Sequence, residues 1–237
     1  MTKGANRWQY ILTGLAALAM VVSLCLVFAY VPTERVMGPV QRIFYFHVPV
    51  AWVAFLAFLV ACAAGLGYLV RRELSCDALQ IASAEIGVVF SATVLMTGSL
   101  WARPIWNTWW TWDPRLTTTL IMWLYYAASL MLRNAAEGEE RKARFSALLN
   151  IIGFVNVPIV FLTIRLWRTI HPVLFTSEGF GLEPRMLVTL MVCLASFTLL
   201  FACLVGIRIR AERLAREVRN LQRHTLARAD EWKGGLR

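Results

Sequence analysis

The sequence offers little material for thiol chemistry. It contains five cysteines, and no two of them have the C-x-x-C spacing of disulfide oxidoreductases. Four lie inside long apolar stretches, and Cys76 lies in a short charged connection. Thiol–disulfide exchange is therefore not the expected mechanism.

Motifs for nucleotide hydrolysis and for bond-making catalysis are missing as well. The pattern G-x-x-x-x-G-K-[ST] does not occur, so ATP hydrolysis would have to come from a partner. No Ser/His/Asp arrangement or pair of carboxylates stands out in the connections at residues 32–49, 102–115 and 165–185, which are assigned to the outer face below. We therefore expect that the chain is not an enzyme.

The alternating pattern of a β-barrel strand is also lacking, and long apolar stretches take its place. Hydrophobic residues make up 59% of the chain, against about 45–50% in soluble domains. Lys3 and Arg7 precede the first stretch, but it is longer than the ~7–15 apolar residues of a signal peptide, so we expect a retained span. The sequence predicts an all-α polytopic membrane bundle in a single domain, residues 1–237, with six transmembrane helices. The predicted spans are residues 10–31, 50–70, 81–101, 116–132, 146–164 and 186–207.

Acidic residues are fewer than basic ones, 14 against 24, and the net charge of +10 follows a topological pattern. Seventeen of the Lys and Arg residues fall on one side of the predicted spans and seven on the other. The positive-inside rule then places both termini in the cytoplasm. Three connections face outward: residues 32–49, 102–115 and 165–185. The basic balance therefore indicates topology, and nucleic acid is not an expected partner.

Two polar features lie within the predicted spans. Glu85 is placed one turn from the cytoplasmic end of the third span, where it is either a functional group or a residue of the first helical turn. Asn156 and Pro158 predict a kink in the fifth span that serves packing.

Charged residues are concentrated in the predicted cytoplasmic segments. The connection at residues 133–145 mixes both signs and is expected only to solvate a turn. The basic tail, residues 208–237, suits a helix that lies on anionic lipid or against a cytoplasmic partner. Its apolar residues recur at helical spacing: Ile207, Leu214, Val218 and Leu221.

Tryptophan is concentrated in one outward connection, which holds five of the ten tryptophans within twelve residues. They are Trp101, Trp106, Trp109, Trp110 and Trp112. An interfacial aromatic belt is one explanation, but a belt spreads its indoles over all helices. A flat aromatic platform is the other, and the concentration in one short connection favours it. The spacing supports it, because Trp106, Trp109, Trp110 and Asp113 share one face if the segment bracketed by Pro104 and Pro114 is locally helical. Asp113 has a structural role available as the N-cap of the fourth span, with Pro114 at its first position.

Two histidines are expected on the same side as the tryptophans. His47 precedes the second span and His171 follows the fifth. Two neutral imidazoles can bind a haem iron from opposite faces, although the residues alone also allow two unrelated interfacial histidines. Arg42 and Arg115 are candidates to pair with haem propionates, and anchoring to lipid phosphate is the alternative for each.

Residues 101–117 resemble the tryptophan-rich "WWD" signature of haem-handling membrane proteins in cytochrome c biogenesis. Within that group, the length and six spans are similar to the haem exporter protein C family of the bacterial cytochrome c maturation system. The likeness extends over residues 42–49, 97–118, 153–158 and 167–171. Ala102 and Asn107 stand where relatives commonly carry glycine, which affects how closely the loop can approach a ligand.

The resemblance implies a bis-histidine haem site. His47 and His171 would be the axial ligands of a non-covalently bound haem b, because no C-x-x-C-H motif is present for covalent attachment. The other residues that it implies in haem binding are Trp101, Trp106, Trp109, Trp110, Trp112, Asp113, Arg42 and Arg115.

The resemblance also implies a place and partners. The chain would lie in the bacterial inner membrane and present haem on the periplasmic side to a membrane-anchored haem chaperone. The ATPase and permease subunits of an ABC transporter and a small membrane protein would assist it. The alternatives are a b-type electron-transfer protein and a solute transporter with a tryptophan gate.

Overall fold

The computed structural model describes residues 3–167, 171, 175–176 and 179–234, which are almost entirely helical. Two short turns join the first two helices, a π turn at Leu26–Tyr30 and a 3-10 turn at Pro39–Ile43. An antiparallel pair of two-residue strands, β1 (Phe175–Thr176) and β2 (Gly179–Phe180), precedes the last helix. The helices are α1 (Lys3–Cys25), α2 (Phe44–Arg71), α3 (Leu74–Trp106), α4 (Pro114–Ala135), α5 (Glu139–Phe154), α6 (Asn156–Leu166) and α7 (Pro184–Gly234).

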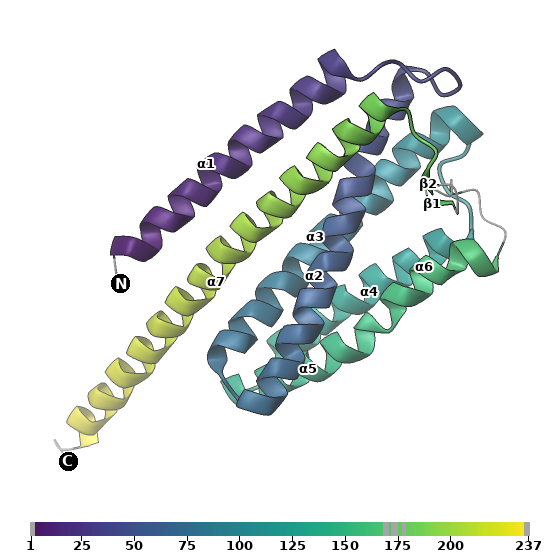
Figure 1. Cartoon of the computed structure of the whole chain (residues 1–237). Helices are drawn as coiled ribbons and strands as arrows, with labels where there is room; N and C mark the ends of the chain where they lie inside the picture. Colours follow the sequence, from purple (N-terminus) through teal and green to yellow (C-terminus); the bar gives the residue numbers. More distant parts are fainter. Residues whose placement is uncertain (1–2, 168–170, 172–174, 177–178, 235–237) are drawn as a thin grey trace.

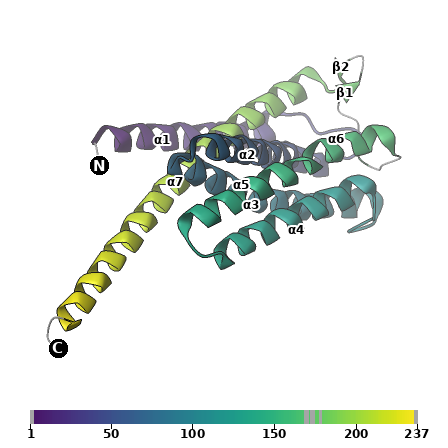
Figure 2. The same cartoon turned by 90° about the horizontal axis from the view of Figure 1, so that it is seen from below.

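The helices form an elongated bundle in which sequence neighbours run antiparallel, except that α6 continues in the direction of α5 (Figure 1). α2 and α3 pack along their lengths at the centre, α1 lies along α7, and α4 to α6 cover the other side. Seen from below, α7 leaves the bundle toward its C-terminal end (Figure 2). Both termini lie at the same end, and the Trp-rich connection between α3 and α4 lies at the opposite end.

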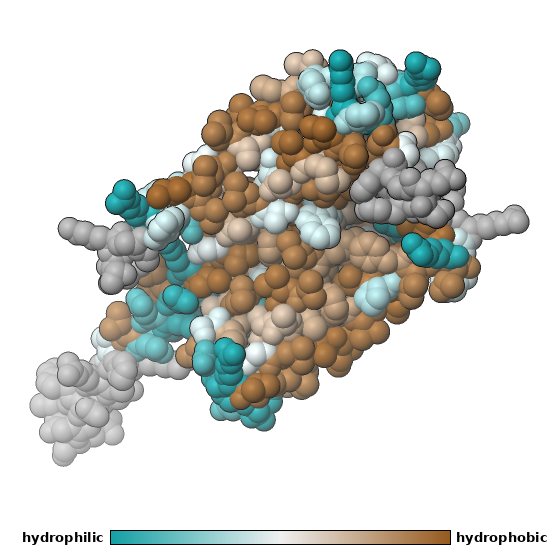
Figure 3. Space-filling model, in the orientation of Figure 1, coloured by the Kyte–Doolittle hydropathy of each residue, from teal (hydrophilic) through white to brown (hydrophobic). Residues whose placement is uncertain are grey.

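The face of the bundle seen in Figure 3 is mostly apolar along its middle, and its polar residues gather toward the ends. Five segments are long and apolar enough to cross a membrane: Arg7–Tyr30, Pro39–Arg71, Leu74–Trp106, Glu139–Leu166 and Pro184–Gln222. α4, which contains the fourth of the six predicted spans, is not among these five, although its 22 residues extend about 33 Å at 1.5 Å per residue, close to a hydrocarbon core of about 30 Å. The predicted all-α membrane bundle is confirmed.

The fifth predicted span is interrupted where the sequence predicts a kink. α5 ends at Phe154 and α6 begins at Asn156, with Val155 between them in helical dihedrals, and Pro158 has no backbone N–H to continue the ladder. The side chain of Asn156 donates through Nδ2 to the carbonyl of Thr118 on α4, 3.0 Å away. The break is therefore fixed to the neighbouring helix.

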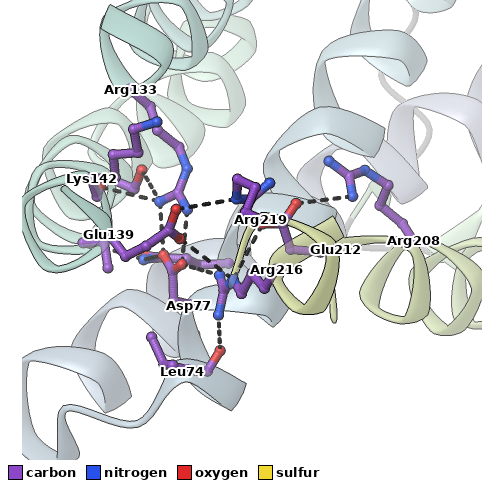
Figure 4. Close-up of polar contacts among 12 residues, drawn as sticks. Leu74, Asp77, Arg133, Glu139, Lys142, Arg208, Glu212, Arg216 and Arg219 are labelled. Carbon is purple, nitrogen blue, oxygen red and sulfur yellow. Dashed lines mark hydrogen bonds and ion pairs between the residues drawn. The ribbon is translucent and has the colours of Figure 1, made fainter. Parts of the chain in front are cut away.

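At the end of the bundle that holds the termini, a buried ion network contradicts the expectation that residues 133–145 only solvate a turn. The carboxylate of Asp77 is fully buried, and Arg133 binds both of its oxygens at 2.8 Å. Arg216 binds Asp77 from α7, and Glu139 lies 3.7 Å from Arg216 Nε (Figure 4). Since Asp77, Arg133, Glu139 and Arg216 come from four helices, the network joins α3, α4, α5 and α7.

The predicted positions of Glu85 and of the basic tail also need correction. α3 begins at Leu74, three turns before Glu85, and Glu85 forms a bidentate ion pair with Arg208 of α7. The tail continues α7 as one helix, and Glu212 on it is buried between Arg208 and Arg216. The start of the tail is thus bound to the bundle by charge, which a count of basic residues could not show.

Candidate haem site

The Trp-rich connection has a defined backbone. α3 ends at Trp106, and Asn107 then adopts the left-handed conformation (φ 54°) that asparagine tolerates better than most residues. Arg103 Nη1 donates to the carbonyl of Asn107 at 2.9 Å and closes the helix end. The carboxylate of Asp113 accepts from Arg115 N at 2.9 Å, which confirms Asp113 as the N-cap of α4.

The local helix expected across residues 106–113 is wrong. Pro104, expected to bound that segment, lies inside the last turn of α3. Proline has no backbone N–H and leaves one carbonyl of the preceding turn without its helical partner. Membrane helices tolerate this where neighbouring groups satisfy that carbonyl. The chain from Thr108 to Trp112 is irregular, so the tryptophans do not share one helical face.

The tryptophans divide into an inner and an outer set. Trp101 is buried on α3 and packs edge-on against His47, with ring centres 5.9 Å apart. Trp106 and Trp110 line the same cavity as Trp101. Trp109 and Trp112 are 56% and 76% exposed and do not line it. Of the five tryptophans, three therefore line the cavity, and the rings of Trp101 and Trp106 are tilted at 51° to each other rather than flat.

A cavity of about 70 Å³ lies between α2, α3, α4 and the Trp-rich connection. Its polar lining includes His47 from α2, His171 from the segment after α6, and Arg115 from the first turn of α4. Phe55 and Leu116 are among its apolar walls. The structure thus brings together two imidazoles that are 124 residues apart in the sequence.

The electrostatics of the cavity favour neutral imidazole at His171. Burial lowers the pKa of His171 to about 4, the positive charge of Arg115 acts in the same direction, and Asp113 opposes it. A neutral imidazole has a nitrogen lone pair for a metal, whereas a protonated one has none. His171 is therefore in its iron-binding form throughout the physiological range of pH.

The two candidate arginines differ in position. Arg115 lines the cavity, and its buried Nη1 has no hydrogen-bond partner among the described residues. A buried guanidinium donor beside a cavity suits a carboxylate. Arg42 does not line the cavity, and its guanidinium lies over the ring of Phe28, 5.9 Å from the ring centre. The structure therefore supports Arg115 as a propionate partner and places Arg42 away from this cavity.

A second and larger hollow lies on the other side of Trp101, which lines both. It measures about 660 Å³, and its lining includes Glu34, Gln41 and Glu183 but neither of the two candidate histidines. The Glu34 carboxylate already accepts from the backbone N–H of Val36 at 2.8 Å. Size alone would favour this hollow for a porphyrin, but its two carboxylates outnumber its one guanidinium, that of Arg35, and it offers the iron no imidazole.

The first cavity has the donors for haem, but it is smaller than the ~300–1,000 Å³ of typical ligand pockets. The two imidazoles suit iron, the Arg115 guanidinium suits a propionate, and the indoles of Trp106 and Trp110 suit the porphyrin face. A whole porphyrin does not fit in about 70 Å³. A porphyrin bound here would therefore extend beyond the cavity or separate its walls.

Two residues at the site were not found from the sequence. Thr97 and Gly98 of α3 contact the ring of His47. Thr97 stands four residues before Trp101 and hence on the same face of the helix. That spacing was the available signal, but nothing in the sequence shows that α2 presents His47 to this face.

Comparison with known proteins extends over most of the chain. A family model described as "Heme exporter protein C" matches residues 1–224. The chain is similar to "Heme exporter protein C" of Bradyrhizobium diazoefficiens, with 38% identity over 82% of this chain and 74% of the relative. The protein of the same name from Escherichia coli K12 is 34% identical over 77% of this chain and 74% of its own length. A "Putative cytochrome c biosynthesis ccmC-like mitochondrial protein" of Marchantia polymorpha is 29% identical over 81% and 82%.

Proposed function

Because the chain belongs to the Heme exporter protein C family and is a multi-pass membrane protein of haem export and cytochrome c biogenesis, we propose that it binds haem at the cavity between His47 and His171 and passes it to a haem chaperone. The observation that supports this most directly is the presence of both imidazoles and the Arg115 guanidinium in one cavity. The proposal places the chain in the bacterial inner membrane, with the cavity on the periplasmic side, which agrees with the smaller number of basic residues at that end.

Each group at the cavity has a task in this proposal. His47 and His171 hold the iron of a non-covalently bound haem b. Arg115 orients the ring by pairing with a propionate, and Trp101, Trp106 and Trp110 exclude water and pack against the porphyrin. The residues need only bind and release, so we infer a transfer component rather than an enzyme. ATPase and permease subunits of an ABC transporter and a small membrane protein would complete the system.

The exposed tryptophans suit the transfer step. Trp109 and Trp112 lie on the outside of the connection that carries Trp110, and Trp109 is held under the guanidinium of Arg103, 5.8 Å from its ring centre. Exposed indoles beside a binding site are typical anchors of a protein interface. In the proposal they meet the incoming chaperone while the inner tryptophans hold haem.

Transfer can be tested with the purified protein in lipid nanodiscs. Protein loaded with haem is mixed with the soluble domain of a bacterial cytochrome c maturation haem chaperone, and the haem in each is measured by absorption after separation. We expect haem to move to the chaperone, and Trp109→Ala with Trp112→Ala to slow the transfer about tenfold or more while the haem content stays unchanged. Haem that stays bound and cycles between oxidation states instead would contradict delivery and favour an electron-transfer protein.

The low pKa of His171 predicts how haem binding depends on pH. A proton competes with iron for an imidazole only below the pKa of the free site, and burial lowers that pKa to about 4 from its ordinary 6.5. We therefore expect haem affinity to be constant between pH 8 and pH 5 and to fall only as pH approaches 4. A haem titration at half-unit steps of pH measures this, and a decline centred near pH 6.5 would show that His171 is exposed to water in the binding form.

A further inference from the structure

The ring of His47 is held on one side by three successive contacts from α3. Thr97 Oγ1 lies 2.9 Å from His47 Nδ1. Gly98 lies under the ring, where an added Cβ would stand 3.2 Å from His47 Cε1. Trp101 packs edge-on against the ring at 5.9 Å between centres. His47 as a whole is 9% exposed, so the orientation of its ring is set by these contacts and by α2.

The hydroxyl proton of Thr97 is committed to the backbone of its own helix. Thr97 Oγ1 donates to the carbonyl of Thr93 at 2.8 Å, with the carbonyl of Val94 at 3.3 Å. Such a bond to the preceding turn is the usual one for threonine in a helix. A hydroxyl has a single proton, so toward His47 the oxygen of Thr97 acts as an acceptor, and Nδ1 of His47 has to carry a hydrogen.

This arrangement decides which nitrogen of His47 is available. In a neutral imidazole one nitrogen carries the hydrogen and the other a lone pair. With the hydrogen at Nδ1, the lone pair lies at Nε2, and Thr97 occupies the Nδ1 side of the ring. The ring lines the cavity that also holds His171 and Arg115. The hydrogen bond thus selects the tautomer that a metal at Nε2 requires.

We propose that Thr97 is a positioning residue for haem binding: its hydroxyl oxygen accepts from His47 Nδ1–H, fixes the ring between Gly98 and Trp101, and keeps Nε2 free to bind iron. The proposal rests on the proposed function of His47 as a haem ligand. It adds Thr97, which does not touch the haem but sets the tautomer and the ring orientation of His47, which does. The absence of a side chain at Gly98 is part of the same device, because a methyl group there would press on the ring that Thr97 holds.

The first test measures the tautomer without haem. The ¹⁵N shifts of His47 in haem-free protein in nanodiscs distinguish a nitrogen that carries hydrogen from one that does not. We expect hydrogen at Nδ1 in the wild-type protein and in Thr97→Ser, which keeps the hydroxyl, and a mixture of tautomers in Thr97→Val, which keeps the shape. Hydrogen at Nε2 in the wild-type protein would overturn the proposal.

The second test measures haem. Removing an outer hydrogen-bond partner of a metal-bound histidine typically costs about 10- to 100-fold in affinity, so we expect this loss and a smaller low-spin fraction in Thr97→Val, with recovery in Thr97→Ser. Thr93→Val is the matched control, because its hydroxyl donates to Val89 one turn earlier and does not reach His47. Unchanged haem affinity in a normally folded Thr97→Val would overturn the proposal. The two ideas can fail separately. If His47→Ala bound haem normally, the proposed role of His47 as a haem ligand would be wrong. If Nδ1 of wild-type His47 still carried its hydrogen, the hydrogen bond to Thr97 would nevertheless be confirmed.

Discussion

Replacing both His47 and His171 with alanine should abolish the low-spin spectrum of bound haem and weaken haem binding by more than about 100-fold. Both imidazoles line one cavity, and burial keeps His171 neutral. Loss of an outer partner of a metal ligand already costs about 10- to 100-fold, so loss of both ligands should exceed that range. The remaining contacts, from the indoles and Arg115, would hold a porphyrin only by packing and charge.

The two single variants should not be equal. His47 lies in the first turn of α2, and α3 fixes its ring through Thr97, Gly98 and Trp101. A ligand that is already oriented loses less entropy on binding, so His47→Ala should cost more affinity than His171→Ala. We expect His171→Ala to retain a five-coordinate, high-spin haem on His47.

Absorption and electron paramagnetic resonance of haem-titrated protein in nanodiscs measure both the affinity and the spin state. His224→Ala is the control, because residue 224 is ten residues from the C-terminal end of α7, and that end of the helix lies far from the Trp-rich connection (Figure 1). A low-spin spectrum that persists in the double variant would show that other residues bind the iron. The assignment of both ligands would then be wrong.

Much of the fold could be predicted from the sequence because it depends on local patterns. The apolar runs predict membrane helices by themselves, because in the hydrocarbon core each backbone N–H and C=O must form its hydrogen bond within its own segment. The N-cap at Asp113 and the break before Pro158 are likewise set by neighbours within four residues. The common side of the two histidines followed from the charge balance of the connections.

The rest depends on contacts between distant segments. The helical pattern of residues 106–113 was misleading because Asn107 turns the chain out of α3, and the outcome is an inner and an outer set of tryptophans. Thr97 gains its role only because α2 presents His47 to it, 50 residues away. Asp77 and Arg133 form an ion pair although they are 56 residues apart. Nothing near either residue in the sequence indicates its partner, so each would be interpreted as a solvated charge.

The Asp77 network leads to the second large effect, which is on stability. Asp77→Asn should lower the free energy of unfolding by about 3–5 kcal/mol, the range for breaking a buried ion pair by removing one partner. The change keeps the shape of the side chain but leaves the buried guanidinium of Arg133 without its carboxylate and weakens the hold on Arg216. Gln80, which donates to Asp77 at 2.7 Å, would lose a charged acceptor as well. Unfolding in mixed micelles with increasing denaturing detergent measures the loss.

The same chain provides a control and a rescue. Glu140→Gln breaks an ion pair with Arg144 whose side chains are 73% and 53% exposed, and such a pair contributes only about 0.3–0.5 kcal/mol. Combining Asp77→Asn with Arg133→Met should recover part of the stability, because a buried charge is then no longer unpaired. Since Arg216 ties α7 to Asp77, Asp77→Asn should also make α7 more sensitive to trypsin near Arg216 and Arg219. The contrary result would be that Asp77→Asn lowers the free energy of unfolding as little as Glu140→Gln does and leaves α7 protected from trypsin. That result would mean that Glu212 and Glu139 hold α7 without Asp77, and that the buried carboxylate is not the centre of the network.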